Sequence, residues 1–454
     1  MSRHDFDVTE GPLLKKTILF TIPIILTSIL QLLFNAADLM VVGTVDEIYV
    51  GAVGATGSVT MLIVNLFIGL SGGIGVVVAQ QLGARDYKGV NKTVHTAIPL
   101  AVISGAILTV TGFFYTAPML KLMGTPEDII GYAEVYMKIY YCGMIPNLIY
   151  NFGASILRAS GDTKGPLYYL TIAGVVNVIL NFIFVKGFNM NVDGVALATI
   201  LSQTVSATLV MLSLTKRIDA IRFDFRDIKI DKESLINILK IGVPAGLQSC
   251  MYSIANIIIQ SSVNSFGSIC VTGNSASQNI EGFAYVVINS FYQSAMTFTG
   301  QNVGAKKYSR INKVLVVNIL CTIISGAFIG VVFNLFLPQM LSLYSVTNAD
   351  AVAFAQTRML FITLPYFLCG MLDVTTGVMR GIGSSLVPMI ISVLGVCGLR
   401  LVWIYTVFAH FHTPEWLFSI YPVSWGTTFV VELIAYIIVR RVRQKKGLEL
   451  SEAQ

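Results

Sequence analysis

Charged residues are scarce in this sequence. Only 12% of its 454 residues are Asp, Glu, Lys or Arg, and 55% are hydrophobic, whereas soluble proteins have about 25% charged residues. This composition excludes an ordinary soluble domain and predicts an integral membrane protein. The basic residues lie in short loops between apolar runs, so the net charge of +6 does not indicate a nucleic-acid partner.

The side-chain clusters that enzymes and cofactor sites need are also missing. The four histidines form no HExxH motif, and the chain contains neither GxSxG nor a Walker motif. Its six cysteines lie far apart without CxxC spacing, which favours small hydrophobic residues in the core over ligands. We therefore expect no enzymatic activity, no cofactor and no direct use of ATP.

Long hydrophobic runs are what the chain has instead. Each is long enough to cross ~30 Å of hydrocarbon as a helix, and Lys and Arg recur in every second loop, which the positive-inside rule assigns to the cytoplasm. We expect a multi-pass protein of the cell membrane with both termini cytoplasmic. The twelve runs begin near Leu13, Val50, Thr93, Ile129, Pro166, Gly194, Leu235, Val271, Val314, Val352, Leu386 and Leu417.

The sequence contains an internal repeat. Residues 80–92 match 301–313 at a shift of 221, and 157–166 match 379–388 at a shift of 222. Because six spans return the chain to its starting side, the two halves are predicted to be parallel repeats. The linker between them is read as a solvated segment that lets two helix bundles rock. The predicted segments are a tail (1–12), an N-lobe (13–215), the linker (216–234), a C-lobe (235–441) and a second tail (442–454).

One polar stripe interrupts the first apolar run. Gln31, Asn35 and Asp38 share one face of a helix, and a carboxylate at this depth costs roughly 2.5–3.5 kcal/mol. Such acids face a protein interior or a wet cavity and mark an ion or substrate path; the alternative is a carboxyl hydrogen-bonded for structure alone. At the repeat shift of 221, Asp38 corresponds to Ile259. Because features that the fold needs should recur in both halves, the acid is expected to serve a working site and not the scaffold.

These motifs resemble those of the multidrug and toxic compound extrusion (MATE) transporters, in the bacterial and archaeal pattern with an Asp in the first helix. The resemblance rests on Phe34-Asn35-Ala-Ala-Asp38, on the paired Gly83-Ala84 and Gly304-Ala305 loops, and on the Leu157-Arg158 and Met379-Arg380 motifs. It implies an all-α, V-shaped exporter of two lobes and twelve transmembrane helices, driven by a proton or sodium gradient.

The resemblance also implies a cation site in the first half. Asn177 and Asn181, with Thr199, would join Asp38 and Asn35 and bind H⁺ or Na⁺. The two Asn side chains lie four residues apart on one helix face, so both amide oxygens can point at one ion. The alternative is that the Asn pair holds two helices together.

Some branches of the family carry a carboxylate in the first helix of the second half, and this sequence has none there, so an ion site of that kind is not expected. Substrate is expected to contact Gln31 together with Gln278, Glu281 and Tyr285. The other and favoured reading is that Arg400 pairs with Glu281 or with Asp373 inside this half and the charges are structural, because buried charges usually need partners. Hinges are expected at the helix prolines Pro23 and Pro244.

The predicted function is secondary active multidrug efflux by alternating access. Small organic cations and drugs would leave in exchange for H⁺ or Na⁺, from a monomer surrounded by membrane lipid. The alternative is a flippase for lipids or lipid-linked oligosaccharides, of the same superfamily. That activity needs a strongly cationic cavity, and the intramembrane basic residues expected here, chiefly Lys138 and Arg400, are few.

Overall fold

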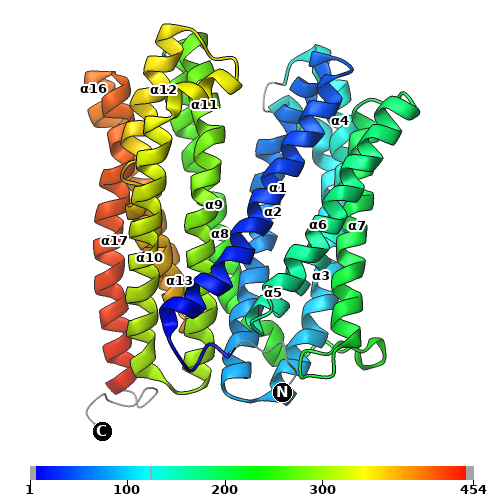
Figure 1. The fold of residues 1–454 in the computed structure, drawn as a ribbon, viewed down its shortest axis with the longest axis vertical. Helices are drawn as coiled ribbons and strands as arrows, with labels where there is room; N and C mark the ends of the chain where they lie inside the picture. Colours follow the sequence, from blue (N-terminus) through cyan, green and yellow to red (C-terminus); the bar gives the residue numbers. More distant parts are fainter. Residues whose placement is uncertain (1–6, 123–124, 446–454) are drawn as a thin grey trace. The chain divides into compact units, whose positions relative to one another are not determined.

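A computed structural model describes residues 7–122 and 125–445, and in these residues the chain is helical without strands (Figure 1). It divides into two compact units. Unit 1 contains Ile22–Gly246, and unit 2 joins Val8–Thr21 to the chain from Leu247 onward. Two helices, α1 (Leu13–Gly43) and α8 (Lys232–Asn264), therefore begin in one unit and end in the other.

Unit 1 is built around α2, which packs against α3, α4 and α5, while α6 packs against α7. A close backbone approach joins the first part of α8 to this unit: a Cβ on Gly69 would lie 2.3 Å from the backbone N of Gly246. The helices are α2 (Glu47–Gly83), α3 (Tyr87–Leu122), α4 (Glu127–Cys142), α5 (Met144–Ala159), α6 (Lys164–Asn181), the π-helix η1 (Phe182–Gly187) and α7 (Val192–Lys216).

Unit 2 is centred on α9, which packs against α10, α12 and α13. The start of α1 joins it through an edge-to-face contact of Phe20 with Phe298 at 5.1 Å. The elements are α9 (Ser268–Gly304), α10 (Tyr308–Leu335), α11 (Leu337–Leu343), α12 (Ala349–Ile362), α13 (Tyr366–Gly381), α14 (Leu386–Ser392), η3 (Val393–Gly398), α15 (Leu399–Trp403), η4 (Ile404–Phe408), α16 (Ala409–Phe411) and α17 (Pro414–Lys445).

A helix stands at each of the twelve predicted spans. Among the described residues, nine helical stretches are long and apolar enough to cross a membrane, and the pair α12 and α13, bent by 43°, makes ten. The other two predicted spans fall on α4 with α5, which are 16 residues each, and on α9, which is rich in Ser, Asn and Gln. The prediction of an all-α integral membrane protein is confirmed.

The repeat is visible in the backbone. Arg85 and Lys306 both adopt φ of 57° at a shift of 221, and Gly161 and Gly383 adopt 93° and 96° at a shift of 222. Left-handed φ is uncommon for residues other than glycine, so its recurrence at matched positions confirms the duplication.

The division into units falls inside two helices. The chain changes unit between Thr21 and Ile22 in α1 and between Gly246 and Leu247 in α8. The predicted hinge residues Pro23 and Pro244 each lie within three positions of a change of unit.

The linker is also less solvated than predicted. It contains the short 3₁₀-helix η2 (Phe225–Asp227), and Ile221 and Phe223 are each 1% exposed. Phe223 stacks on His95 of α3, whose Nε2 accepts a hydrogen bond from the backbone N of Asp224 at 3.0 Å. This part of the linker is fixed to unit 1.

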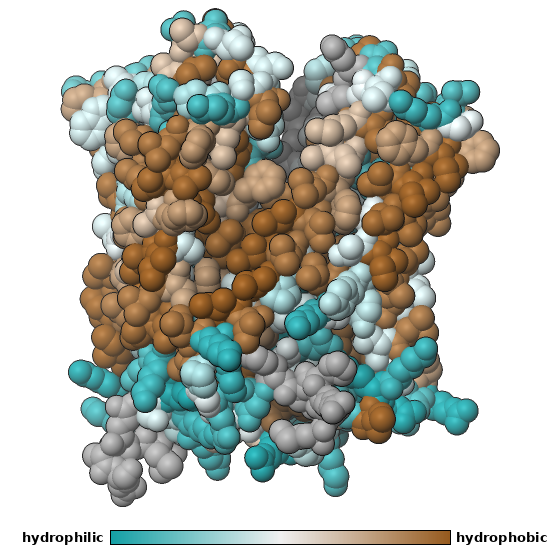
Figure 2. Space-filling view, viewed as in Figure 1, coloured by the Kyte–Doolittle hydropathy of each residue, from teal (hydrophilic) through white to brown (hydrophobic). Residues whose placement is uncertain are grey.

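Apolar side chains cover the flanks of the helices in each unit, and hydrophilic residues gather at the helix ends (Figure 2). On α10, Ile324, Phe328 and Leu335 are 68–70% exposed. Their spacing places them along one helix face. An apolar surface of this kind is stable in contact with lipid, whereas soluble proteins rarely expose so much.

Candidate functional site

The Asp38 site in unit 1 is assembled from α1, α6 and α7. Asn181 Nδ2 donates a hydrogen bond to Asp38 Oδ1 at 2.5 Å, and Thr199 Oγ1 donates to Asp38 Oδ2 at 3.2 Å. The same Asn181 nitrogen lies 3.3 Å from Asn177 Oδ1. The structure therefore brings together four of the five residues that were predicted to bind the cation.

A close contact of α1 with α6 positions these groups. Phe34 lies over Gly174, where a Cβ would come within 1.8 Å of the ring, so only glycine fits there. Asp38 is one turn beyond Phe34, while Asn177 and Asn181 are one and two turns beyond Gly174. The packing of Phe34 on Gly174 thus sets the register that places the carboxyl beside the two amides.

The Asp38 carboxyl is buried without a basic partner. Asp38 is 8% exposed, Asn177 4% and Asn181 0%, and none of the ion pairs recorded for residues 7–122 and 125–445 involves Asp38. Only neutral donors contact its oxygens, and Asn181 Oδ1 is buried without a hydrogen-bond partner. Carboxylate, amide and hydroxyl oxygens suit a hard cation such as Na⁺, and the carboxyl can take a proton.

Asn35 is not part of this cluster. It lies one turn before Asp38 but is exposed, and no hydrogen bond to the Asp38 carboxyl is recorded for it in the described structure. Sequence reasoning missed two aromatic neighbours, Tyr136 and Tyr140 of α4, which stack at 6.0 Å and lie close enough to interact electrostatically with Asp38. Their four-residue spacing was the available signal.

The residues predicted to contact substrate are divided between the two units. Gln31 on α1 is exposed and belongs to unit 1. On α9 in unit 2, Gln278 is exposed and Tyr285 is 46% exposed. Glu281, between them, is partly buried and faces other side chains of its own unit.

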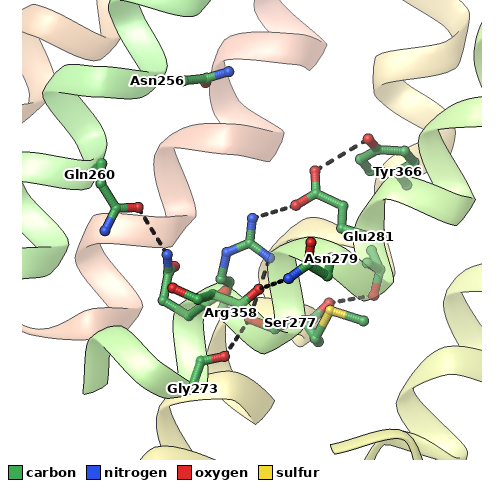
Figure 3. Close-up of polar contacts among 12 residues, drawn as sticks. Asn256, Gln260, Gly273, Ser277, Asn279, Glu281, Arg358 and Tyr366 are labelled. Carbon is green, nitrogen blue, oxygen red and sulfur yellow. Dashed lines mark hydrogen bonds and ion pairs between the residues drawn. The ribbon is translucent and has the colours of Figure 1, made fainter. Parts of the chain in front are cut away.

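Glu281 is neutralised by Arg358 of α12, which forms an ion pair with its Oε2 (Figure 3). Tyr366 donates from its hydroxyl to Glu281 Oε1 at 3.2 Å. The predicted pairing of Arg400 with an acid is wrong, because Arg400 donates to Asn256 Oδ1 at 3.1 Å and its guanidinium lies 4.3 Å from the centre of the Tyr421 ring. Sequence spacing could not select Arg358, since pairing depends on which helices face each other.

The sequence model of the MatE family matches residues 23–183 and 244–406. The chain belongs to the MatE family. These two blocks cover both halves of the repeat, so each half carries one copy of the family unit. A structure described as an outward-facing conformation of a multidrug resistance MATE family transporter of the MOP superfamily shares the fold, with a TM-score of 0.90 at 22% identity, covering 98% of this chain and 99% of that one.

Curated relatives of this MatE protein are named for multidrug resistance or export. The chain is 29% identical over 393 residues to the "Probable multidrug resistance protein YoeA" of Bacillus subtilis, covering 84% of each chain. It is 24% identical over 404 residues to the "Multidrug export protein MepA" of Staphylococcus saprophyticus, covering 85% of this chain and 88% of the relative. A MOP superfamily transporter from Pyrococcus furiosus shares the fold with a TM-score of 0.91 at 22% identity, covering 98% and 99% of the two chains.

Proposed function

We propose that this MatE protein is a secondary active multidrug efflux transporter in which Asp38 carries the coupling ion, H⁺ or Na⁺. The observation that carries the proposal is a buried carboxyl contacted by Asn181 and Thr199 and, in the part of the chain that the structure describes, by no basic residue. A carboxylate held in a permanent ion pair with a basic side chain could not bind and release a coupling ion. A carboxyl with neutral partners can bind a cation and release it again.

The exchange links cargo to ion. Small organic cations and Asp38's ion compete for the same negative charge, so uptake of the ion from outside favours release of cargo. The membrane potential contributes ~2.3 kcal/mol per charge per 100 mV to this exchange. Bending of α1 and α8 near Pro23 and Pro244 would accompany the change between inward and outward access, and the change of unit at these helices supports that role.

The setting that we infer is the cell membrane, with both chain ends on the cytoplasmic side and the protein acting as a monomer in lipid. No cofactor enters this scheme, because the ion gradient supplies the energy.

The orientation can be tested with single cysteines placed in the 217–231 linker and in the outer loops. These cysteines are labelled with a reagent that cannot cross the membrane.

A lipid flippase is the alternative, and it would need basic groups free to bind phosphate. The buried arginines of unit 2 do not supply them. Arg358 is paired with Glu281, and Arg400 is held by Asn256 and Tyr421. Arg380 donates to Tyr292 and Gln248, and Arg440 donates to the Tyr436 hydroxyl and the backbone O of Tyr308. These contacts favour export of cations.

The test is Asp38→Asn in proteoliposomes loaded with ethidium, assayed under a proton gradient and, separately, under a sodium gradient. We expect loss of gradient-driven efflux under whichever gradient drives the wild type. Asp193→Asn is the matched control, because Asp193 is a carboxylate at the start of α7 that accepts from the backbone N of Asn191. An Asp38→Asn protein with full gradient-dependent efflux would refute the proposal.

A further inference from the structure

A second carboxyl is buried in unit 2, far along the sequence from the Asp38 site. Glu432 lies in the middle of α17 and is 0% exposed. Thr376 of α13 donates a hydrogen bond to its Oε1 at 2.7 Å. Its other oxygen, Oε2, is buried without a hydrogen-bond partner in the described structure. An ionised carboxylate this deep would need donors or a cation at both oxygens.

A further buried oxygen without a partner lies on the same helix face. Thr428 lies one turn before Glu432 on α17, and its Oγ1 is unpartnered in the described structure. The chain after α14 approaches α17 at this point, since a Cβ on Gly395 would lie 2.3 Å from Thr428 Oγ1. Tyr252 of α8 interacts electrostatically with Glu432 and lies within hydrogen-bonding reach of Ser392 at the end of α14.

The charges around Glu432 do not form an ion pair with it. Asp373 and Arg380, both on α13, are the charged groups that act on it electrostatically. Arg380 donates instead to the Tyr292 hydroxyl at 2.5 Å and to Gln248 Oε1 at 2.7 Å. On α17, Tyr436 lies one turn beyond Glu432 and donates to Asn312 Oδ1 at 2.6 Å.

We propose that Glu432 is a proton-binding site of unit 2, separate from Asp38. Its Oε2 carries the proton, and the unpartnered hydroxyl of Thr428, one turn away on the same face of α17, is the available acceptor for the resulting O–H. Binding adds one proton to the carboxylate and gives the neutral acid, with no other bond made or broken. The role in transport rests on the proposed function: Glu432 would release and regain one proton per cycle in addition to the ion at Asp38.

The direct test is infrared difference spectroscopy of the purified protein, which detects the carbonyl stretch of a protonated carboxyl. We expect Glu432→Gln to lose this band and Asp38→Asn to retain it. Glu432→Asp keeps a carboxyl and should show the band at a shifted position, so the site stays testable even where the Gln variant folds poorly. Glu415→Gln, at an exposed acid in the first turn of α17, is the control that leaves the band unchanged.

The second measurement counts protons moved per exported ethidium in proteoliposomes with a pH-sensitive dye. We expect Glu432→Gln to lower the count by one, and Glu415→Gln to leave it as in the wild type. An unchanged band and an unchanged count in Glu432→Gln would overturn the proposal. Loss of the band in Glu432→Gln with efflux intact in Asp38→Asn would uphold the Glu432 site and overturn the proposed role of Asp38 instead.

Discussion

The two units share a backbone plan, but the surroundings of Asp38 in unit 1 and of Glu281 in unit 2 differ. In unit 1, Asp38 is contacted by the neutral side chains of Asn181 and Thr199, and its counterpart in the repeat, Ile259, is packed in an apolar cluster of unit 2. In unit 2, Glu281 is paired with Arg358. The same helical scaffold thus holds one acid available to an ion and another whose charge is already balanced.

The π-helices sharpen this contrast. In unit 1, η1 begins directly after Asn181, and in unit 2, η4 begins at Ile404, which is the same place in the repeat at a shift of 222. Isolated π-turns are frequent at functional sites, yet of this matched pair only η1 directly follows a side chain that hydrogen-bonds a carboxyl in the described structure, Asn181 to Asp38. The distortion therefore belongs to the fold, and the side chains around it determine whether an ion can bind.

The largest effect should come from breaking the balanced pair. Arg358→Met leaves Glu281 partly buried without its cation, and removal of one partner of a buried ion pair costs about 3–5 kcal/mol. We expect a clear drop in the denaturation temperature in detergent. The double variant Glu281→Gln with Arg358→Met should recover most of it, because no unpaired charge remains.

The control for this pair is Arg441→Met, at an exposed arginine near the end of α17, which should change stability by less than about 0.5 kcal/mol. A single Arg358→Met protein as stable as the wild type would mean that Glu281 does not depend on Arg358. Glu281 would then not differ from Asp38 in needing a basic partner.

How far the sequence predicts this arrangement depends on the range of the contacts. Helical periodicity placed Asn177 and Asn181 on one face, and the family resemblance joined them to Asp38, because these are short patterns. The partner of Glu281 and the burial of Glu432 could not be read in this way, since α9, α12 and α17 meet only in the folded unit. The exposure of Asn35 likewise depends on which face of α1 is covered.

A smaller effect should follow from removing one donor to Asp38. Thr199→Val deletes the hydroxyl that lies 3.2 Å from Asp38 Oδ2, and a hydrogen bond to a charged group contributes about 1.5–3 kcal/mol, which corresponds to about tenfold or more in ion affinity. The direction of the change identifies the ion. Proton uptake becomes easier because the anion has lost a donor, whereas Na⁺ binding becomes weaker because the ion has lost an oxygen ligand.

The ion concentration at half-maximal efflux measures this change. Thr204→Val is the matched control, since Thr204 lies on the same helix, is exposed and donates only to the backbone O of Ile200 at 2.8 Å. Equal ion dependence in the Thr199→Val and Thr204→Val proteins would exclude Thr199 from the ion site.

The smallest effect is expected from substituting the acid that precedes the first helix of each half of the repeat. Asp231 precedes α8, and its Oδ2 accepts from the backbone N and the hydroxyl of Ser234 at 2.9 and 3.0 Å. Its counterpart Glu10, at a shift of 221, forms an exposed ion pair with Lys307 at 3.0 Å. Of these two acids, Asp231 is therefore the one that caps a helix start. Asp231→Ala should speed amide exchange in the first turn of α8, whereas Glu10→Ala should leave the first turn of α1 nearly unchanged.

The pH dependence separates the cap from the charge. Hydrogen bonds from Ser234, chiefly its backbone N–H, hold the pKa of Asp231 below its usual range. A carboxyl whose folded pKa is depressed stabilises the fold above its unfolded pKa of about 3.9 and loses that contribution as the pH falls through the folded value. Asp231→Asn keeps a capping oxygen at every pH. Exchange at the start of α8, measured by mass spectrometry, should therefore accelerate in acid for the wild type relative to Asp231→Asn, and parallel behaviour of the two proteins would show that the carboxylate charge does not stabilise this helix start.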